Sequence, residues 1–298
     1  MRADRPQDRV YARAAGVLAV LAGTGLGALL AGAQGAIWGA VLGLALARVL
    51  AHLVGRRIAH RRAALDRPFP EAWRKLLEAR YDHYDRLPEA LRRRFQDDVR
   101  ILLAEKRITG VELEVTDELR VLVAASAVTL SLGWPDYDWD QLAEVLLYPD
   151  SFDRDYRFGG DEYAGLTHPW GTVILSVPAL EKSFQHPDDG YHVGIHEFAH
   201  LLDMDHTHFD GIPVGLDAVR SREWVALMDK EMERLRHRKS ALDPYGANDP
   251  IEFLAVAVEA FFEIPLLMRK RHREVYAILS AYFGQDPAAW DDERGLVL

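Results

Sequence analysis

The segment HEFAHLLDMDH, residues 196–206, places histidine and glutamate at a spacing that suits a metal-dependent hydrolase. On a helix, His196 and His200 share one face because they are four residues apart, so both rings can reach one metal ion. Glu197 can then act as general base toward a metal-activated water. The rest of this helix, predicted over 193–202, is uncharged and suits the core, where such polar side chains would be costly without a purpose.

A catalytic zinc ion needs a third protein ligand, and two candidates exist. His206 completes the longer pattern H-E-x-x-H-x-x-D-x-x-H. In the corresponding three-histidine pattern, a glycine stands where this chain has Asp203 and bends the chain back to the metal, and no later Met-turn is evident. His206 and His208 therefore fit polar loop residues better than ligands.

The second candidate is a glutamate from the later segment NDPIEFLAVAVEAFFEIP, residues 248–265. Asn248 or Asp249 can cap a helix predicted over 250–263, whose other residues are largely apolar. Glu252 and Glu259 are seven residues apart and share a face of that helix. Two carboxylates there need a metal or another cation, unless both pair with arginine on a half-exposed face.

Further segments predict the elements that must position these side chains. A helical pattern covers 87–107, and Asp117 to Gly133 reads as a buried helix closed by glycine. We expect strands of one small sheet at 111–115, 144–149 and 171–176, and further helices at 220–236 and 266–283. One α+β domain over 69–298 is the simplest interpretation.

The N-terminal region indicates a membrane anchor. Residues 14–47 contain no charged side chain, and as one helix they would be about 51 Å long, beyond the ~30 Å hydrocarbon core. The segment AGAQGA, residues 31–36, interrupts this stretch, so we predict a transmembrane helical hairpin over 14–54. The alternatives are a signal peptide cleaved after Ala33 and a buried soluble hairpin.

Arginine flanks the predicted hairpin on both sides, in a basic tail (1–13) and a basic linker (55–68). The positive-inside rule then places both flanks in the cytoplasm. We therefore expect a protein of the cytoplasmic (inner) membrane whose catalytic domain faces the cytoplasm.

Charge and residue composition restrict which classes of partner and which metal ligands are expected. Residues 1–62 contain nine Arg and two Asp, a formal charge of +7 in a chain of −10, so the remainder carries −17. Such an acidic domain repels nucleic acid, and none is expected as a partner. The chain has no cysteine, so a metal must be held by His, Asp or Glu.

Taken together, GTVILS, HEFAHLLD and DPIEFLAVAVEAFF resemble the Mlc titration factor A family of zinc peptidases, as do EVLLYPDSF and LLAEKRITGVELEV. The resemblance covers about residues 87–287. It implies a gluzincin-like domain in which Zn²⁺ is held by His196, His200 and Glu252, with Glu197 as base. Asp203 also matches the family, so it need not be explained as a substitution of the glycine in the longer three-histidine pattern.

The resemblance also implies supporting residues. Tyr245 occupies a position similar to that of the tyrosine before the glutamate ligand in anthrax-lethal-factor-type gluzincins, where a phenol can donate to an oxyanion. A simple turn tyrosine is the alternative. Apart from the resemblance, Glu259 is a candidate to orient a ligand histidine, and Asp203 is a second candidate for such a supporting role.

The family is credited with aminopeptidase-like activity and with binding a glucose-responsive transcriptional repressor. Two classes of function follow: a peptidase acting on a peptide or protein substrate, and a regulatory module that titrates a repressor, with hydrolysis secondary. A membrane-embedded protease of the CAAX-processing type is a third interpretation, disfavoured by the long domain after a single hairpin. The hairpin lies outside the resemblance and suggests a substrate or partner at the membrane.

Overall fold

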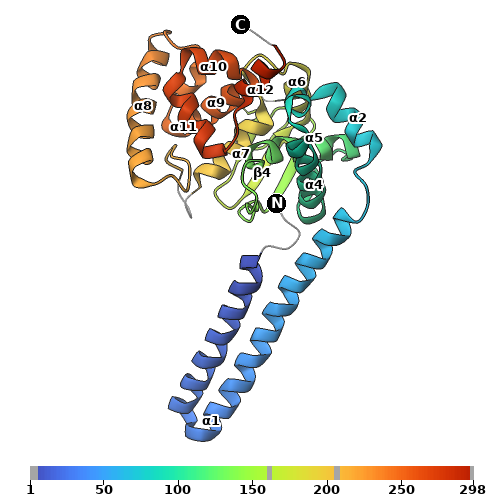
Figure 1. The fold of residues 1–298 in the computed structure, drawn as a ribbon, viewed down its shortest axis with the longest axis vertical. Coiled ribbons are helices and arrows are strands. Elements are labelled where there is room, and N and C mark those ends of the chain that lie inside the picture. The colour runs from blue at the N-terminus through green and yellow to red at the C-terminus, as the bar shows by residue number, and fades with distance from the viewer. Residues whose placement is uncertain (1–5, 160–162, 205–208, 296–298) are drawn as a thin grey trace. The chain divides into compact units, whose positions relative to one another are not determined.

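The computed structural model describes residues 6–159, 163–204 and 209–295. The chain divides into two compact units, residues 2–68 and 69–298, which we treat separately. It combines a small four-stranded sheet with many helices and has one long apolar helical segment at its N-terminus (Figure 1).

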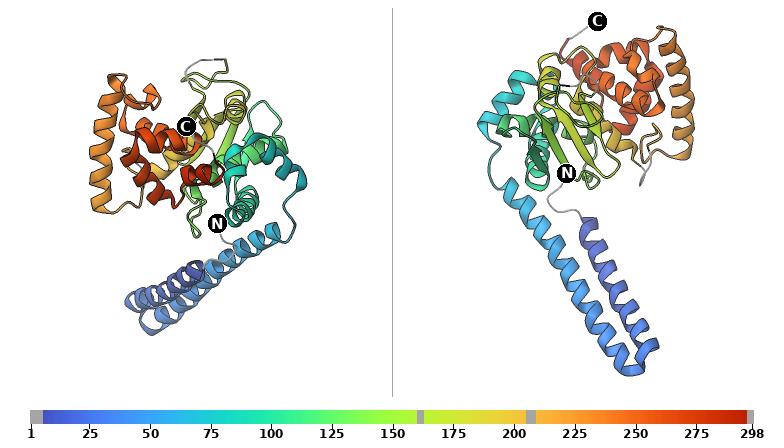
Figure 2. Two further views of the ribbon diagram at one scale, coloured as in Figure 1. Left: turned by 45° about the horizontal axis from the view of Figure 1, so that its top comes forward. Right: turned by 180° about the vertical axis from the view of Figure 1, so that it is seen from behind.

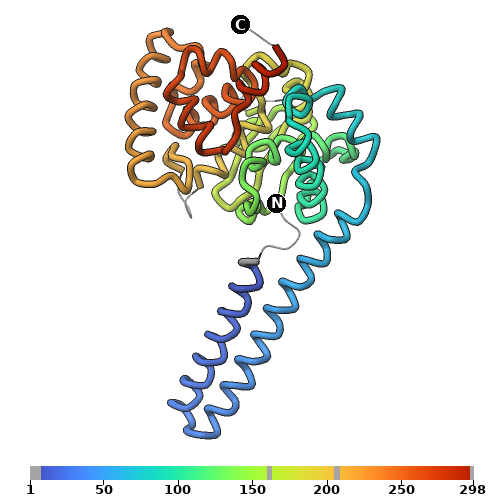
Figure 3. Tube along the Cα trace, viewed as in Figure 1, coloured from blue at the N-terminus to red at the C-terminus, as the bar shows by residue number. Residues whose placement is uncertain are grey.

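The N-terminal unit consists of helix α1 (Pro6–Leu65), which is interrupted once. Ala31 and Gly32 leave helical conformation, and Gly32 adopts a φ of 59° that glycine tolerates. The two arms that result lie side by side and run in opposite directions (Figure 3). A Cβ atom at Gly23 would overlap the backbone of Gly39, so the arms touch through their backbones.

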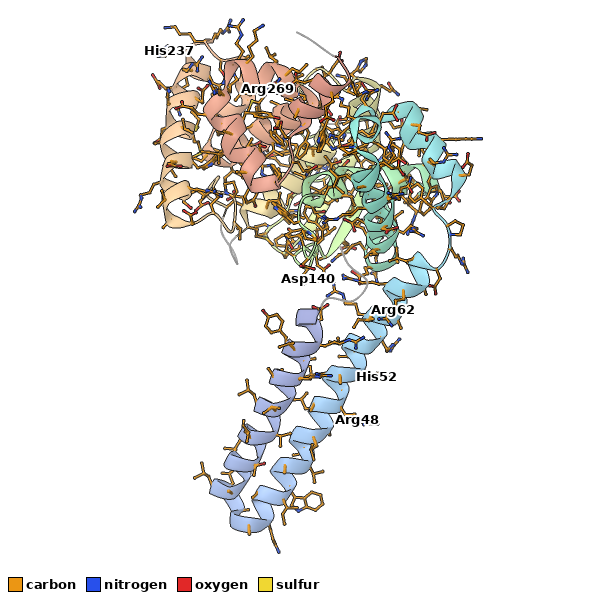
Figure 4. The ribbon with its side chains drawn as sticks, in the orientation of Figure 1. Arg48, His52, Arg62, Asp140, His237 and Arg269 are labelled. Atoms are coloured by element: carbon orange, nitrogen blue, oxygen red, sulfur yellow. The ribbon has the colours of Figure 1, made fainter. Side chains whose placement is uncertain are left out.

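The outer surface of these arms is apolar. Their most apolar 18-residue window has a mean hydropathy of 2.0, and only 6% of it is buried within the structure. Leu29 and Trp38 are among the large apolar side chains left exposed. Helical structure extends beyond the predicted hairpin into both flanks, because it begins at Pro6 and continues to Leu65, where a linker was expected. Figure 4 shows Arg48, His52 and Arg62 along the second arm.

The C-terminal unit contains one sheet of strand order β1-β2-β4-β3. Strands β1 and β2 pair in parallel, as do β2 and β4, whereas β3 runs antiparallel to β4 at the edge. The strands are β1 (Arg107–Gly110), β2 (Glu144–Tyr148), β3 (Gly165–Thr167) and β4 (Thr172–Ser176).

The unit also contains many helices, and Figure 2 shows it from two further directions. They are α2 (Glu71–Arg80), α3 (Asp82–Arg86), α4 (Glu89–Glu105), α5 (Asp117–Ser131), α6 (Val177–Gln185), α7 (Val193–Asp203), α8 (Ala218–Arg236), the 3₁₀ turn η1 (Pro244–Ala247), α9 (Pro250–Glu263), α10 (Pro265–Arg271), α11 (Arg273–Phe283) and α12 (Pro287–Glu293). Helix α7 packs against α9, α5 and strand β3, and also against β4 and α6.

The structure confirms the elements predicted at 117–133, 144–149, 171–176 and 250–263, within two residues at each end. The strand predicted at 111–115 is wrong. The pairing strand is β1, four residues earlier, and the chain turns away at Glu112, whose φ is 58°. The helix predicted at 266–283 is two helices that meet at His272. The buried ring of His272 bonds both to Glu231 of α8 and to the backbone of Ala241.

Candidate metal centre

Helix α7 carries the first group of site residues and is fully buried. It begins at His192, whose ring nitrogen Nδ1 accepts the backbone N–H of Ile195 at 3.3 Å. His196, Glu197 and His200 are each less than one tenth exposed. Their side chains bring one ligand atom each to within 4.8 Å of the others.

Helix α9 brings the second group. Asp249 caps it by accepting the backbone N–H groups of Ile251 and Glu252. Glu252 therefore lies in the first turn, and its Oε2 atom is 3.0 Å from Nε2 of His196 and 3.9 Å from Nε2 of His200. One carboxylate oxygen thus stands between two imidazole nitrogens.

These three atoms fit a metal ion. Two ligands about 2.1 Å from a tetrahedral zinc ion are about 3.4 Å apart, which lies between the separations of 3.0 Å and 3.9 Å given above. Glu197 is near both histidines as well, but Glu252 offers a single oxygen to both imidazole nitrogens. Two imidazoles and one carboxylate are a donor set typical of catalytic zinc. The structure places His196, His200 and Glu252 together, and their role as ligands stays a prediction.

The surroundings of the two histidines shift their pKa values in opposite directions. Burial lowers the pKa of His196, but the carboxylates of Glu259 and Glu252 outweigh burial and hold it well above the ordinary value. Burial, aided by His196, lowers the pKa of His200 to about 3. A cation at the shared Glu252 oxygen would replace the proton that His196 otherwise carries there, and His200 is already neutral.

Glu259, predicted to support a ligand, contacts His196 directly. Its Oε2 atom accepts from Nδ1 of His196 at 3.1 Å, which leaves Nε2 to face Glu252. Its Oε1 atom accepts the backbone N–H of His192 at 2.8 Å.

Asp203 has different partners from those expected. Its carboxylate accepts the backbone N–H groups of Asp210, Gly211 and Ile212 and so fixes the chain after α7. Nδ1 of His200 is buried without a hydrogen bond in the described part of the chain, so Asp203 is not its partner there. His206 and His208 lie outside the described residues.

Glu197 lies near both histidines and also contacts strand β3. Burial raises the pKa of its carboxyl to about 7, although His196 and a hydrogen bond from Thr167 act in the opposite direction. Its Oε2 atom lies 2.8 Å from Oγ1 of Thr167 in strand β3. A carboxyl group whose pKa lies near neutral pH is suited to taking and returning a proton.

A cavity of about 290 Å³ adjoins His196 and Glu197. Its other lining residues are Tyr163, Ala164, Gly165, Tyr191, Val193, Asp243, Tyr245, Val256 and Glu259. The ring of Tyr245 lies 6.1 Å from that of His196, centroid to centroid. Partial burial and the nearby Glu252 raise the pKa of Tyr245 to about 12, so its hydroxyl keeps the proton that a donor needs.

Sequence reasoning missed the contribution of strand β3. Thr167 and Gly165 both contact Glu197, but a three-residue strand is too short for a clear alternating pattern. The available signal was the pair of turn-forming residues Pro169 and Gly171 just before strand β4, which suggests a hairpin. His192 and Asp243 are further site residues that the sequence did not single out.

A buried histidine–glutamate cluster beside a cavity is an arrangement that suits a metallopeptidase. Residues 56–284 match the model of the family described as glucose-regulated metallo-peptidase M90, and the chain belongs to this family. It is 30% identical to the Mlc titration factor A of Edwardsiella ictaluri over 77% of this chain and 92% of that protein. It is 30% identical to that of Yersinia enterocolitica over 64% and 79%, and 29% identical to an uncharacterized protein of Synechocystis over 74% and 86%.

Proposed function

We propose that the protein is a membrane-anchored, zinc-dependent peptidase of the gluzincin type. The observation that carries this proposal is the position of one Glu252 oxygen between the Nε2 atoms of His196 and His200, with Glu197 beside them on a cavity. Membership of a metallopeptidase family supports it.

His196, His200 and Glu252 would hold the ion. A bound zinc ion would supply Lewis-acid polarisation and a more acidic water. Glu197 takes a proton from the attacking water and delivers it to the leaving amine. Tyr245 donates its hydroxyl hydrogen to the oxyanion that forms at the substrate carbonyl.

The membrane part of the proposal rests on the arms of α1. Their apolar exteriors and close glycine contacts suit a transmembrane hairpin, because small residues let helices approach in lipid. Arginine at both ends of the hairpin favours the cytoplasmic side of the inner membrane for these ends, and hence for the peptidase domain.

A second candidate function is supported by the names of the relatives, which are called titration factors for Mlc. In that case the domain binds a repressor or another regulatory partner, and hydrolysis is secondary.

The variant Glu197→Gln separates the two functions, because it removes the base and leaves the proposed ligands in place. The full chain in detergent or nanodiscs should lose hydrolysis of amino-acyl and blocked peptides by at least ~10²-fold, the usual contribution of a positioned base. Zinc per protein should stay near that of the wild type. The exposed Glu223→Gln on α8 is the matched control. Full activity in Glu197→Gln would show that the hydrolysis does not come from this site, and it would favour the binding function.

A further inference from the structure

Strand β3 contacts Glu197 through Thr167, thirty residues earlier in the chain. Oγ1 of Thr167 lies 2.8 Å from the carboxylate Oε2 of Glu197 and 2.8 Å from the backbone oxygen of the same residue. Thr167 is paired with Val173 of β4, so the sheet fixes its backbone. The hydroxyl has one hydrogen, so it shares that hydrogen between the side chain and the main chain of Glu197 in a three-centre hydrogen bond.

The chemistry of this bridge favours one carboxylate orientation. Threonine is stiff about its first side-chain torsion because it is branched at Cβ, so the sheet determines where Oγ1 lies. Glu197, by contrast, has three rotatable bonds. A hydrogen bond from a fixed hydroxyl to an ionised carboxylate is among the stronger hydrogen bonds in proteins, and here it restrains a flexible side chain.

Gly165 supplies the other half of the restraint. It stands two residues before Thr167, so both face the same side of the strand. A Cβ atom at Gly165 would come within 2.5 Å of Oε1 and 2.6 Å of Cγ of Glu197. The carboxylate therefore lies against bare backbone at Gly165 and is held at its other oxygen by Thr167.

Thr167 is separate from the substrate space. The cavity beside His196 is lined by Gly165 and Glu197 but not by Thr167. Thr167 therefore does not line the cavity that a substrate would occupy, and its hydroxyl contacts Glu197.

We propose that Thr167 is a positioning residue, whose hydroxyl sets the orientation of the Glu197 carboxylate toward the water that it deprotonates. The inference rests on the proposed role of Glu197 as general base. It assigns strand β3 a part in catalysis in addition to its part in the sheet.

The test compares Thr167→Val, which keeps the shape and removes the hydroxyl, with Thr167→Ser, which keeps the hydroxyl. Because small misplacements of a catalytic group cost up to ~10² in rate, kcat of Thr167→Val should fall ~10- to 100-fold. KM, zinc content and the unfolding midpoint should stay near wild type. Thr167→Ser should restore most of kcat. Thr109→Val, on the opposite edge strand β1, is the matched control and should behave as wild type.

Unchanged kcat in Thr167→Val would overturn the inference, as would a change confined to KM or a loss of zinc and stability together. If the valine variant does not fold, Thr167→Ala against Thr167→Ser repeats the hydroxyl comparison. Glu197→Gln is assayed alongside. Full activity in Glu197→Gln would contradict the proposed function itself. If Glu197→Gln is inactive and Thr167→Val is fully active, only the proposed role of Thr167 is contradicted.

Discussion

Glu259 holds the ring of His196 and the start of its helix with one carboxylate. One oxygen accepts from Nδ1 of His196 at 3.1 Å, and the other accepts the backbone N–H of His192 at 2.8 Å. Glu259 is itself only 1% exposed. Helix α9 therefore sets both the position of α7 and the direction in which Nε2 of His196 points.

Replacing Glu259 with glutamine should weaken metal binding. Glutamine has one oxygen acceptor and cannot accept both bonds, so the ring of His196 loses its fixed orientation. Loss of such a supporting partner typically costs 10- to 100-fold in metal affinity, and we expect a decrease of about that size. Competition with a chromogenic chelator measures it, and an unchanged zinc affinity would contradict the expectation.

Replacing Glu252 with alanine should remove most of the bound zinc, because a catalytic site with three protein ligands then retains two. The measurement is zinc per purified protein by elemental analysis. His206→Ala serves as the comparison and should keep its zinc. The reverse pattern would favour the three-histidine arrangement.

Replacing Tyr245 with phenylalanine should lower kcat by at most ~10²–10³, the range for one oxyanion donor. KM and zinc content should remain near wild type, since Tyr245 is no proposed ligand. Steady-state kinetics on a short peptide provide the measurement. Tyr156→Phe, outside the cavity lining, is the control. If Tyr245→Phe is as active as Tyr156→Phe, Tyr245 has no role in catalysis and serves only in the turn.

The direction of the membrane hairpin is testable with reporters. Arginine-rich flanks favour the cytoplasm, so a reporter inserted at Gln34 should lie outside the cytoplasm and one fused after Leu298 inside it. Paired phosphatase and fluorescent-protein fusions distinguish the two sides. A C-terminal reporter found outside would indicate a single span or a processed signal peptide.

A buried pair away from the metal centre should make stability depend on pH. His272 accepts the N–H of Ala241 at Nε2 and donates from Nδ1 to Glu231 at 3.0 Å. Burial raises the pKa of Glu231, but its bonds to His272 and Arg234 outweigh this and hold the pKa below the ordinary value. A lowered folded pKa means that the stabilisation is complete above the ordinary pKa of about 4.3 and is lost as pH falls through the folded value.

Glu231→Gln should therefore lower the free energy of unfolding by ~1–3 kcal/mol at pH 7. The difference from wild type should shrink below about pH 4. Urea titrations followed by tryptophan fluorescence at several pH values measure this difference. A gap that stays constant between pH 7 and pH 3 would show that the charge of Glu231 is not the cause.

Long patterned segments were predictable from the sequence, and short or tertiary features were not. Helix α9 was predicted with its observed bounds because a cap, a proline and an apolar run coincide at its start. The break at His272 was not, because bonds to Glu231 and Ala241 from distant segments decide it. Strand β3 owes its existence to pairing with β4 more than to its own three residues.

The site shows the same division. The four-residue spacing of His196 and His200 follows from helix geometry alone. The proximity of Glu252 depends on how α9 crosses α7, which only the resemblance to a family could indicate. Asp203 fitted a supporting role by position, but three backbone N–H groups of the following segment take its carboxylate.

The crossing of α7 and α9 would also govern how long the protein survives in the cell. The chain has no cysteine, so no disulfide restricts it, and Glu252 is 56 residues from His196. An ion held by both helices would act as a reversible cross-link over that distance. A ligand that binds only the folded state at 1,000 times its Kd adds about 4 kcal/mol of stability. Changes of ~1–2 kcal/mol already alter abundance several-fold, so metal supply would set the amount of this protein as well as its activity.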